Sequence, residues 1–238
     1  GCLRVKAFAF PDTLTTIRKE AFKDCKKAET ITFGKGITII EDSAFYRCES
    51  LKELTIPNGA ATTIGDRAFI NCISLRKVTL GNNVTSIGAE AFSVDESAGS
   101  GGLKLRELVI GDSVTTIGNY AFKGSRKLCK VTVGSSVRTI GTDAFLNCQV
   151  LREICDKSTA LSFTRGASTY GGIAKYAFYI RSASAATRIS SDENGLVYYT
   201  DGTSKQLICV ILDDTQDIVI PDDVTEVAKF ACYNEQYI

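Results

Sequence analysis

The sequence predicts a solenoid, in which copies of one short motif coil along a single axis and each copy adds one strand to a parallel sheet. Three observations predict this fold class: a phenylalanine that recurs at a nearly constant spacing, an isoleucine at a fixed distance before it, and turn residues at one position of every copy. The chain has 238 residues, of which 44% are hydrophobic, and this is enough to fill a continuous core.

The dipeptide Ala-Phe marks the repeat. Its phenylalanines are spaced by 23, 24, 23, 30, 23 and 33 residues, gaps that a base period of 23 with insertions explains. Because so short a unit buries too little apolar surface to fold alone, the copies must stack. The phenylalanines are Phe22, Phe45, Phe69, Phe92, Phe122, Phe145 and Phe178, each preceded at five residues by Ile17, Ile40, Ile64, Ile87, Ile117, Ile140 or Ile173.

Alternating apolar and polar residues follow most of these phenylalanines, as in Leu51–Ile56 and Leu75–Leu80, and predict a strand in each repeat. Proline or glycine stands directly after the strand, and a second glycine follows the isoleucine, so we expect two corners in each coil. One unit reads L-x-x-L-x-I-(G/P)-x-x-V-T-x-I-G-x-x-A-F-x-x-C-x-x. We expect one or two helical turns in the Ile-Gly-x-x-Ala-Phe segment. The pattern as a whole predicts a leucine-rich-repeat solenoid, a right-handed α/β superhelix rich in β-structure.

The repeat phase runs through both ends of the chain, so we expect residues 1–238 to form a single leucine-rich-repeat domain cut from a longer array. Three insertions interrupt it, at about 94–102, 156–172 and 190–217. The first is polar and rich in glycine, and the second contains two aromatic residues that could pack. The third holds two apolar runs around Asp201-Gly202, which predicts a β-hairpin. After it, Val224, Val227, Ala231 and Cys232 resume the repeat motif.

The repeat cores I-G-x-x-A-F-x-x-C and the strand L-x-x-L-x-I-(P/G) resemble those of the BspA-like leucine-rich repeat family. The insertion D-E-N-G-L-V-Y-Y, followed by K-Q-L-I, is similar to the hairpin of that family. The resemblance covers nearly the whole chain. It implies a surface or secreted protein of a bacterium or protist, of a kind implicated in adhesion to host matrix proteins and in coaggregation.

Five of the nine cysteines, Cys2, Cys25, Cys48, Cys72 and Cys148, occupy one position of the repeat. Free cysteine behaves as a small apolar residue, so we expect a ladder of buried thiols. Neighbouring rungs would lie near disulfide range, which leaves a Cys25–Cys48 bond open. Cys129 and Cys155 fall on outward strand positions, where we expect them to be incidental.

The composition argues against several functions. Histidine is absent, which removes Ser-His and Cys-His pairs and the commonest neutral metal ligand. We therefore expect no enzyme activity, no metal and no cofactor. The net charge of +1 gives no reason to expect nucleic acid as a partner. The longest apolar run, Leu207–Leu212, has six residues, far fewer than a membrane-spanning helix needs.

The outward side chains of the predicted strands are the candidate partner-binding face. In the second outward column the charge alternates from repeat to repeat, and the two charged columns together hold six basic and three acidic residues. Alternating charges could simply fix the register of the sheet, since each exposed pair is worth only about 0–1 kcal/mol. Solenoids also use such a face for binding. The face comprises Lys52, Glu53, Thr55, Arg76, Lys77, Thr79, Arg106, Glu107, Val109, Lys130, Thr132, Arg152 and Glu153.

Two functions fit these observations. The first is a non-enzymatic surface or secreted protein that binds a protein ligand, such as a matrix protein or a protein on another cell. The second is a structural spacer that presents another domain. In either case we expect a monomer or a weak end-to-end dimer. An enzyme would need a deep pocket lined by facing carboxylates.

Overall fold

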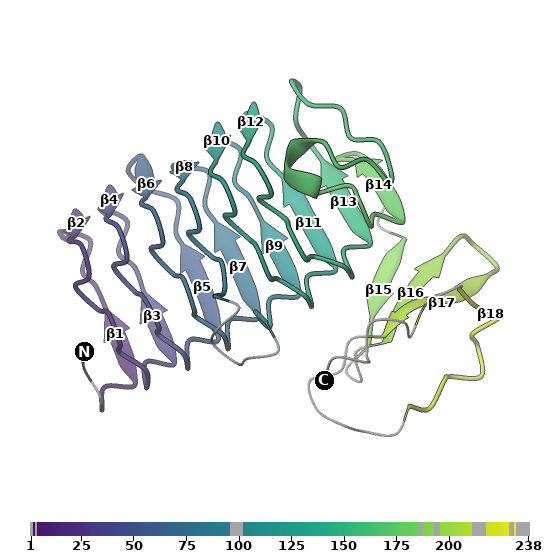
Figure 1. Cartoon of the computed structure of the whole chain (residues 1–238), viewed down its shortest axis with the longest axis horizontal. Coiled ribbons are helices and arrows are strands. Elements are labelled where there is room, and N and C mark those ends of the chain that lie inside the picture. The colour runs from purple at the N-terminus through teal and green to yellow at the C-terminus, as the bar shows by residue number, and fades with distance from the viewer. Residues whose placement is uncertain are drawn as a thin grey trace.

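The computed structural model describes residues 2, 4–95, 102–185, 188–192, 196–210, 218–228 and 231. Within these residues the strands form three sheets: two long parallel sheets that run along a coil, and a smaller sheet after the coil. Figure 1 shows the coil as a row of stacked turns with the smaller sheet beyond its far end. This is the expected leucine-rich-repeat solenoid, built mainly of short strands and turns.

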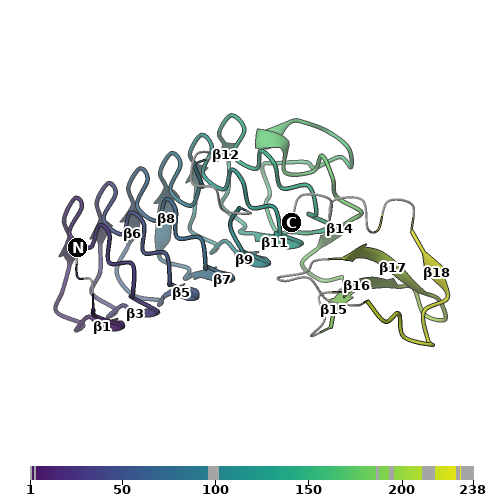
Figure 2. The same cartoon turned by 60° about the horizontal axis from the view of Figure 1, so that its bottom comes forward.

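The larger sheet takes one strand from each of eight successive coils, in chain order and all parallel. Figure 2 shows these strands following one another along one side of the coil. The register keeps equivalent repeat positions side by side, as in the row Leu54, Val78 and Leu108. The strands are β1 (Ala7–Ala9), β3 (Thr30–Thr32), β5 (Glu53–Ile56), β7 (Lys77–Leu80), β9 (Glu107–Val109), β11 (Lys130–Val133), β13 (Glu153–Asp156) and β14 (Tyr179–Ser182).

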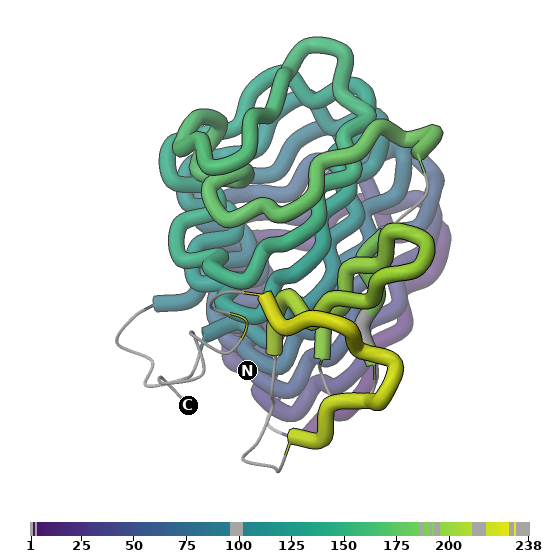
Figure 3. Tube along the Cα trace, turned by 90° about the vertical axis from the view of Figure 1, so that its right-hand side faces the viewer, coloured from purple at the N-terminus to yellow at the C-terminus, as the bar shows by residue number. Residues whose placement is uncertain are grey.

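The second parallel sheet comes from the V-T-x-I part of the motif, so each coil turns a corner between its two strands. Figure 3, viewed towards the C-terminal side, shows the coils stacked one behind another. The strands are very short because a corner follows at once. They are β2 (Thr16–Ile17), β4 (Ile39–Ile40), β6 (Thr62–Ile64), β8 (Val84–Ile87), β10 (Thr116–Ile117) and β12 (Thr139–Ile140).

The Ala-Phe segments form successive tight turns, which corrects the expectation of helical turns there. In the first coil the N–H groups of Ala21 and Lys23 donate to carbonyls three residues back, whereas the N–H group of Phe22 donates to the carbonyl of Ala44 in the next coil at 2.7 Å. Glu20 has a positive φ of 55°, and residues at the same place in later coils do too. A left-handed residue ends any helix, and alternate amides are already used to join the coils.

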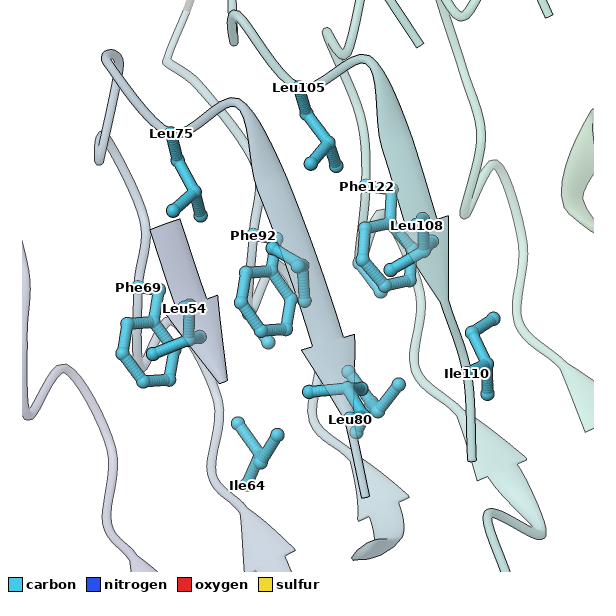
Figure 4. Close-up of a cluster of buried hydrophobic side chains, with 14 of the residues drawn as sticks. Leu54, Ile64, Phe69, Leu75, Leu80, Phe92, Leu105, Leu108, Ile110 and Phe122 are labelled. Atoms are coloured by element: carbon cyan, nitrogen blue, oxygen red, sulfur yellow. The ribbon is translucent and has the colours of Figure 1, made fainter. Parts of the chain in front are cut away.

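The phenylalanines form a continuous column inside the coil. Phe45 and Phe69 stack with ring centroids 5.0 Å apart, and Phe69 and Phe92 follow at 5.2 Å, with the rings nearly parallel in both pairs. Phe92, Phe122 and Phe145 continue the column at 5.3 Å. Figure 4 shows the rings of Phe69, Phe92 and Phe122 beside leucine and isoleucine side chains from both sheets. All five rings are at most 2% exposed. Stacking of the coils therefore buries apolar surface that a single repeat would leave exposed to water.

Phe178 lies outside this column, which corrects its place in the predicted repeat. Its N–H group donates to the carbonyl of Arg152 at 2.9 Å, so it occupies a strand position and not a core position. The second insertion, with the 3₁₀ turn η2 (Tyr170–Gly172), supplies the turn of this coil instead. Phe163 and Tyr170 pack edge to face with centroids 5.6 Å apart, so this insertion does pack.

The smaller sheet follows the solenoid. β16 (Leu196–Thr200) and β17 (Lys205–Val210) pair antiparallel around Gly202, which confirms the predicted hairpin. β15 (Ile189–Ser191) joins β16, and β18 (Glu226–Val227) pairs parallel with β17. Of the predicted C-terminal motif, Val224 and Ala231 pack against this sheet, whereas Cys232 lies outside the described residues, as do residues 96–101 and 211–217 of the insertions.

The repeat cysteines form the expected ladder of thiols at four of its five positions. Cys25, Cys48, Cys72 and Cys148 are buried and free, whereas Cys2 is free and exposed. The Cys48 and Cys72 thiols donate to carbonyls of the preceding coil, those of Phe22 and Phe45, at 3.4 Å each. The thiols therefore also satisfy backbone acceptors between coils.

Candidate functional site

The outward columns of the large sheet align as the repeat predicts. In the second column Glu53, Lys77, Glu107, Lys130 and Glu153 are consecutive partners across the sheet. The alternation of charge in the sequence is therefore an alternation in space, with opposite charges on adjacent strands. Adjacent opposite charges favour this register over a slipped one.

Exposure decreases along this face toward the C-terminal end of the coil. The candidate residues on and beside β5 and β7 are exposed except the half-buried Thr79, and those on and beside β9 and β11 are half-buried. The exposed members are Lys52, Glu53, Thr55, Arg76 and Lys77, and the half-buried members are Thr79, Arg106, Glu107, Val109, Lys130, Thr132 and Arg152.

Glu153 is fully buried, which removes it from the candidate face. Its carboxylate accepts a hydrogen bond of 2.6 Å from the Arg181 guanidinium on β14. Burial is the strongest influence on Arg181 and acts against its charge, but the hydrogen bond to Glu153 and the neighbouring charges together outweigh burial and hold the pKa of Arg181 above its usual value. This pair could not be predicted from the repeat pattern, because Arg181 comes from the coil that follows the second insertion.

The first outward column begins with an exposed ion pair. Lys52 Nζ lies 2.8 Å from a Glu29 carboxylate oxygen on the preceding coil. This hydrogen bond and the charge of Lys52 lower the pKa of Glu29. Both groups stay in contact with water, so the pair aligns the two coils and adds little to stability.

The smaller sheet packs onto the same column at the C-terminal end. Cys129 stands there in the place that arginine or lysine takes in neighbouring coils, and it clusters with Val150, Val197, Ile208 and Cys209. Burial raises the pKa of the Cys129 thiol to about 12. Cys155 is also buried. Both thiols are therefore buried and not outward-facing on the surface, and Cys129 is a packing residue between the solenoid and the smaller sheet.

Aromatic rings meet where the two parts touch, and we call Phe178, Tyr179, Tyr199 and Arg188 the aromatic corner. Tyr199 on β16 packs edge to face on Phe178 at 5.2 Å and against Tyr179 at 5.9 Å. Arg188 lies 6.0 Å from the centre of the Tyr179 ring and donates to the Tyr199 hydroxyl at 3.1 Å. The sequence interpretation missed this cluster because it assigned Phe178 to the core, although the paired aromatic residues Phe178 and Tyr179 were a signal.

Among the residues that the structure describes, the hollow that holds acidic side chains offers no unengaged acid–base pair. This hollow of about 420 Å³ lies beside the turns of the first four coils and holds Glu49 and Asp95. Glu49 is paired with Lys26 at 3.0 Å and Arg47 at 3.3 Å, and Asp95 accepts from the Asn71 amide at 2.9 Å. Both carboxylates are thus engaged in joining coils. Among the described residues no group of three cysteine or acidic side chains is placed to hold a metal ion.

The fold and this face define the protein as a leucine-rich-repeat solenoid. The sequence profile of the BspA type leucine rich repeat region matches it in six copies, over residues 1–100 and 94–166. The chain therefore belongs to the BspA type leucine-rich repeat family. No curated protein matches its sequence.

Several solved structures are similar. A leucine-rich repeat protein of Eubacterium ventriosum aligns with a TM-score of 0.54 at 22% identity, over 80% of this chain and 47% of that one. The Treponema pallidum leucine rich repeat protein is 27% identical over 51% of this chain and 53% of that one, with a TM-score of 0.43. A Faecalibacterium prausnitzii protein described as a leucine rich cell surface protein is 18% identical over 77% of this chain and 61% of that one, with a TM-score of 0.44. The chain thus spans about half to three-fifths of the length of these proteins.

In the part of the chain that the structure describes, no helix has the length and apolar character needed to cross a membrane.

Proposed function

We propose that this chain is a non-enzymatic protein-binding segment of a surface or secreted protein, and that its partner docks on the outward face of the large sheet. The observation that carries the proposal is the exposed part of this face, where Lys52, Arg76 and Lys77 stand beside Glu53 and Thr55 in aligned columns. Rigid strands hold these side chains in place, so binding orders little of the protein. Membership of the BspA type family supports the surface location.

Docking of the smaller sheet at one end of this face supports the same proposal. There the outward positions hold Cys129 and Phe178, and the residues that cover them are apolar or aromatic. Toward β5 the same positions hold charged residues that no other part of the described chain covers. The face is thus an interface inside the molecule at one end and an open polar surface at the other.

A binding panel tests the proposal. Immobilised chain is exposed to purified matrix proteins, namely fibronectin, laminin and collagen, at micromolar concentration, and binding is followed by interferometry. The double variant Arg76→Glu, Lys77→Glu reverses two charges of the face, and Lys35→Glu reverses one exposed charge outside it. We expect a partner whose affinity falls about tenfold or more in the double variant and stays unchanged in Lys35→Glu.

The rival function is a structural spacer, and the same panel separates the two. A spacer would bind none of these proteins, and charge reversal on β7 would change no interaction. Binding that survives the double variant would move the partner site away from the large sheet.

A further inference from the structure

A strongly basic segment wraps the C-terminal end of the solenoid. Residues 157–191 contain five basic residues and no acidic one, whereas the whole chain has a net charge of only +1. This segment includes the second insertion, β14 and the start of the smaller sheet. Its charge is therefore concentrated at the end of the coil, where the large sheet stops.

Two of the five charges serve the fold. Lys157 pairs with Asp112 at 3.4 Å, and Arg181 pairs with the buried Glu153. The other three, Arg165, Lys175 and Arg188, are exposed. No ion pair joins these three to a carboxylate of the residues that the structure describes. The segment therefore presents three cations whose charge nothing in the described chain neutralises by contact.

Two of the three cations lie over tyrosine rings, and the third donates to the backbone of an aromatic residue. Arg188 lies over the Tyr179 ring and donates a hydrogen bond to the Tyr199 hydroxyl, as described for the aromatic corner. Lys175 Nζ lies 5.3 Å from the centre of the Tyr176 ring, and Tyr176 itself is exposed. Arg165 donates to the carbonyl of Phe178 at 3.1 Å. Arginine and tyrosine held in place in this way are the residue types enriched at the energetic centres of protein interfaces.

A shallow hollow of about 560 Å³ lies within this cluster, lined by Phe163, Thr164, Arg165, Phe178, Tyr179 and Ile180. The hollow lies beside β14, which supplies Tyr179 and Ile180 to its lining and is the last strand of the large sheet among the described residues. Figure 1 shows β14 at the end of that sheet, between the loop that carries η2 and the smaller sheet. Its walls are apolar and aromatic, and its polar groups are cationic or neutral. Its size falls in the range of about 300–1,000 Å³ typical of ligand sites.

We propose that this hollow and the aromatic corner bind an acidic, extended segment of the partner protein, in which carboxylates flank one apolar side chain. The apolar side chain enters between Phe163 and Phe178, and the carboxylates pair with Arg165 and Arg188. The proposal rests on the protein-binding function proposed above and names the chemistry of the partner. It also adds a second contact region at the C-terminal end of the open face.

The surroundings favour a protein segment over a nucleic acid or a sulfated polysaccharide. A regular polyanion draws its affinity from many cations in a row. Here three cations stand among aromatic rings, and the same sheet carries Asp156 on β13 and Glu107 on β9 as well as lysine and arginine. A short acidic stretch with an apolar residue matches both the charge and the apolar walls, whereas a long polyanion would meet these carboxylates.

Fluorescence anisotropy of a fluorescein-labelled peptide, in which glutamates flank one phenylalanine, tests the proposal on the full chain. We expect binding that weakens about tenfold or more in Arg165→Glu and in Arg188→Glu, as for arginines at an interface centre. Arg165→Gln is included because it removes the charge and keeps a donor for the Phe178 carbonyl. Lys35→Glu, an equal charge change at the other end of the coil, should leave the affinity unchanged. A peptide with serine in place of phenylalanine should bind more weakly.

Three results would overturn the proposal: no binding of the peptide, equal loss in Lys35→Glu, or tighter binding of a heparin fragment at the same residues. Thermal unfolding of each variant ensures that a loss reflects the site and not the fold. The outcome is independent of the matrix-protein panel. If a matrix protein binds and its binding weakens in Arg76→Glu, Lys77→Glu, while the labelled peptide does not bind, the protein-binding function stands and the acidic-segment site is rejected.

Discussion

The solenoid and the smaller sheet are stabilised in different ways. In the solenoid every coil repeats the same contacts with its neighbours, so one core runs from Ile17 on β2 through Ile154 on β13 to Ala174 and contains the buried phenylalanines of the column. The smaller sheet has two small clusters of its own, and it depends on Cys129, Val150 and Phe178 of the solenoid to cover one of them. Contacts repeated between neighbouring coils make unfolding cooperative along the solenoid. The single contact between the solenoid and the smaller sheet has no such repetition. We therefore expect local changes to spread in the first region and to stay local in the second.

The largest expected effect is the loss of one ring from the column. Phe92 is 0% exposed and stacks on a ring from each neighbouring coil. Phe92→Ala should lower the free energy of unfolding by about 3–5 kcal/mol, because it leaves a cavity between coils that cannot collapse. Phe178→Ala, outside the column and half-buried, should cost about 1–2 kcal/mol. Urea unfolding followed by circular dichroism measures both, and equal losses would contradict the contrast.

The next effect concerns the buried ion pair near the junction. Glu153→Gln should lower the free energy of unfolding by about 3 kcal/mol or more, because Arg181 keeps its charge with only 13% of its side chain exposed. The double variant Glu153→Gln, Arg181→Leu should recover much of this loss, since no unpaired charge remains. A double variant as unstable as the single one would mean that the pair acts through packing and not through charge.

A smaller effect is expected at glycines where coils approach closely. A Cβ on Gly88 would stand 2.5 Å from the carbonyl carbon of Gly65 and 2.6 Å from the N atom of Asp66, so Gly88→Ala should cost about 1–3 kcal/mol. Gly202 in the hairpin has open space around it and a φ of 98°. Gly202→Ala should therefore cost only the strain of a left-handed backbone, about 1 kcal/mol. Thermal unfolding midpoints rank the two, and the reverse order would count against crowding between coils.

The smallest effect is expected for the exposed pair of Glu29 and Lys52. Because Lys52 lowers the pKa of Glu29 in the folded state, the pair stabilises the fold above the ordinary glutamate pKa of 4.5. That contribution is lost as the pH falls through the lowered pKa of the folded state. Glu29→Gln should match the wild-type midpoint at low pH and lie slightly below it at neutral pH. A variant that is less stable at every pH would show that the carboxylate does more than pair with Lys52.

Much of the site could be read from the sequence, because the repeat phase fixes which side chains point outward. The columns headed by Lys52, Glu53 and Thr55 lie in the predicted register. The sequence could not show that Glu153 is buried, since its partner Arg181 belongs to a coil whose phase was misread at Phe178. It also could not bring Tyr199 to Phe178, because contact between a hairpin and a coil end follows no period.

The sequence by itself determined the stacking. A motif of about 23 residues with its apolar residues at fixed positions has one way to bury them, against copies of itself, and this decided the parallel sheets and the phenylalanine column. Only the tertiary structure decided where the regular repeat ends and the insertions take over its positions. At β14 the turn comes from the second insertion, and the smaller sheet covers the outward column. The physical reason is that repetition constrains neighbouring coils, whereas an insertion is constrained only by the surface it happens to meet.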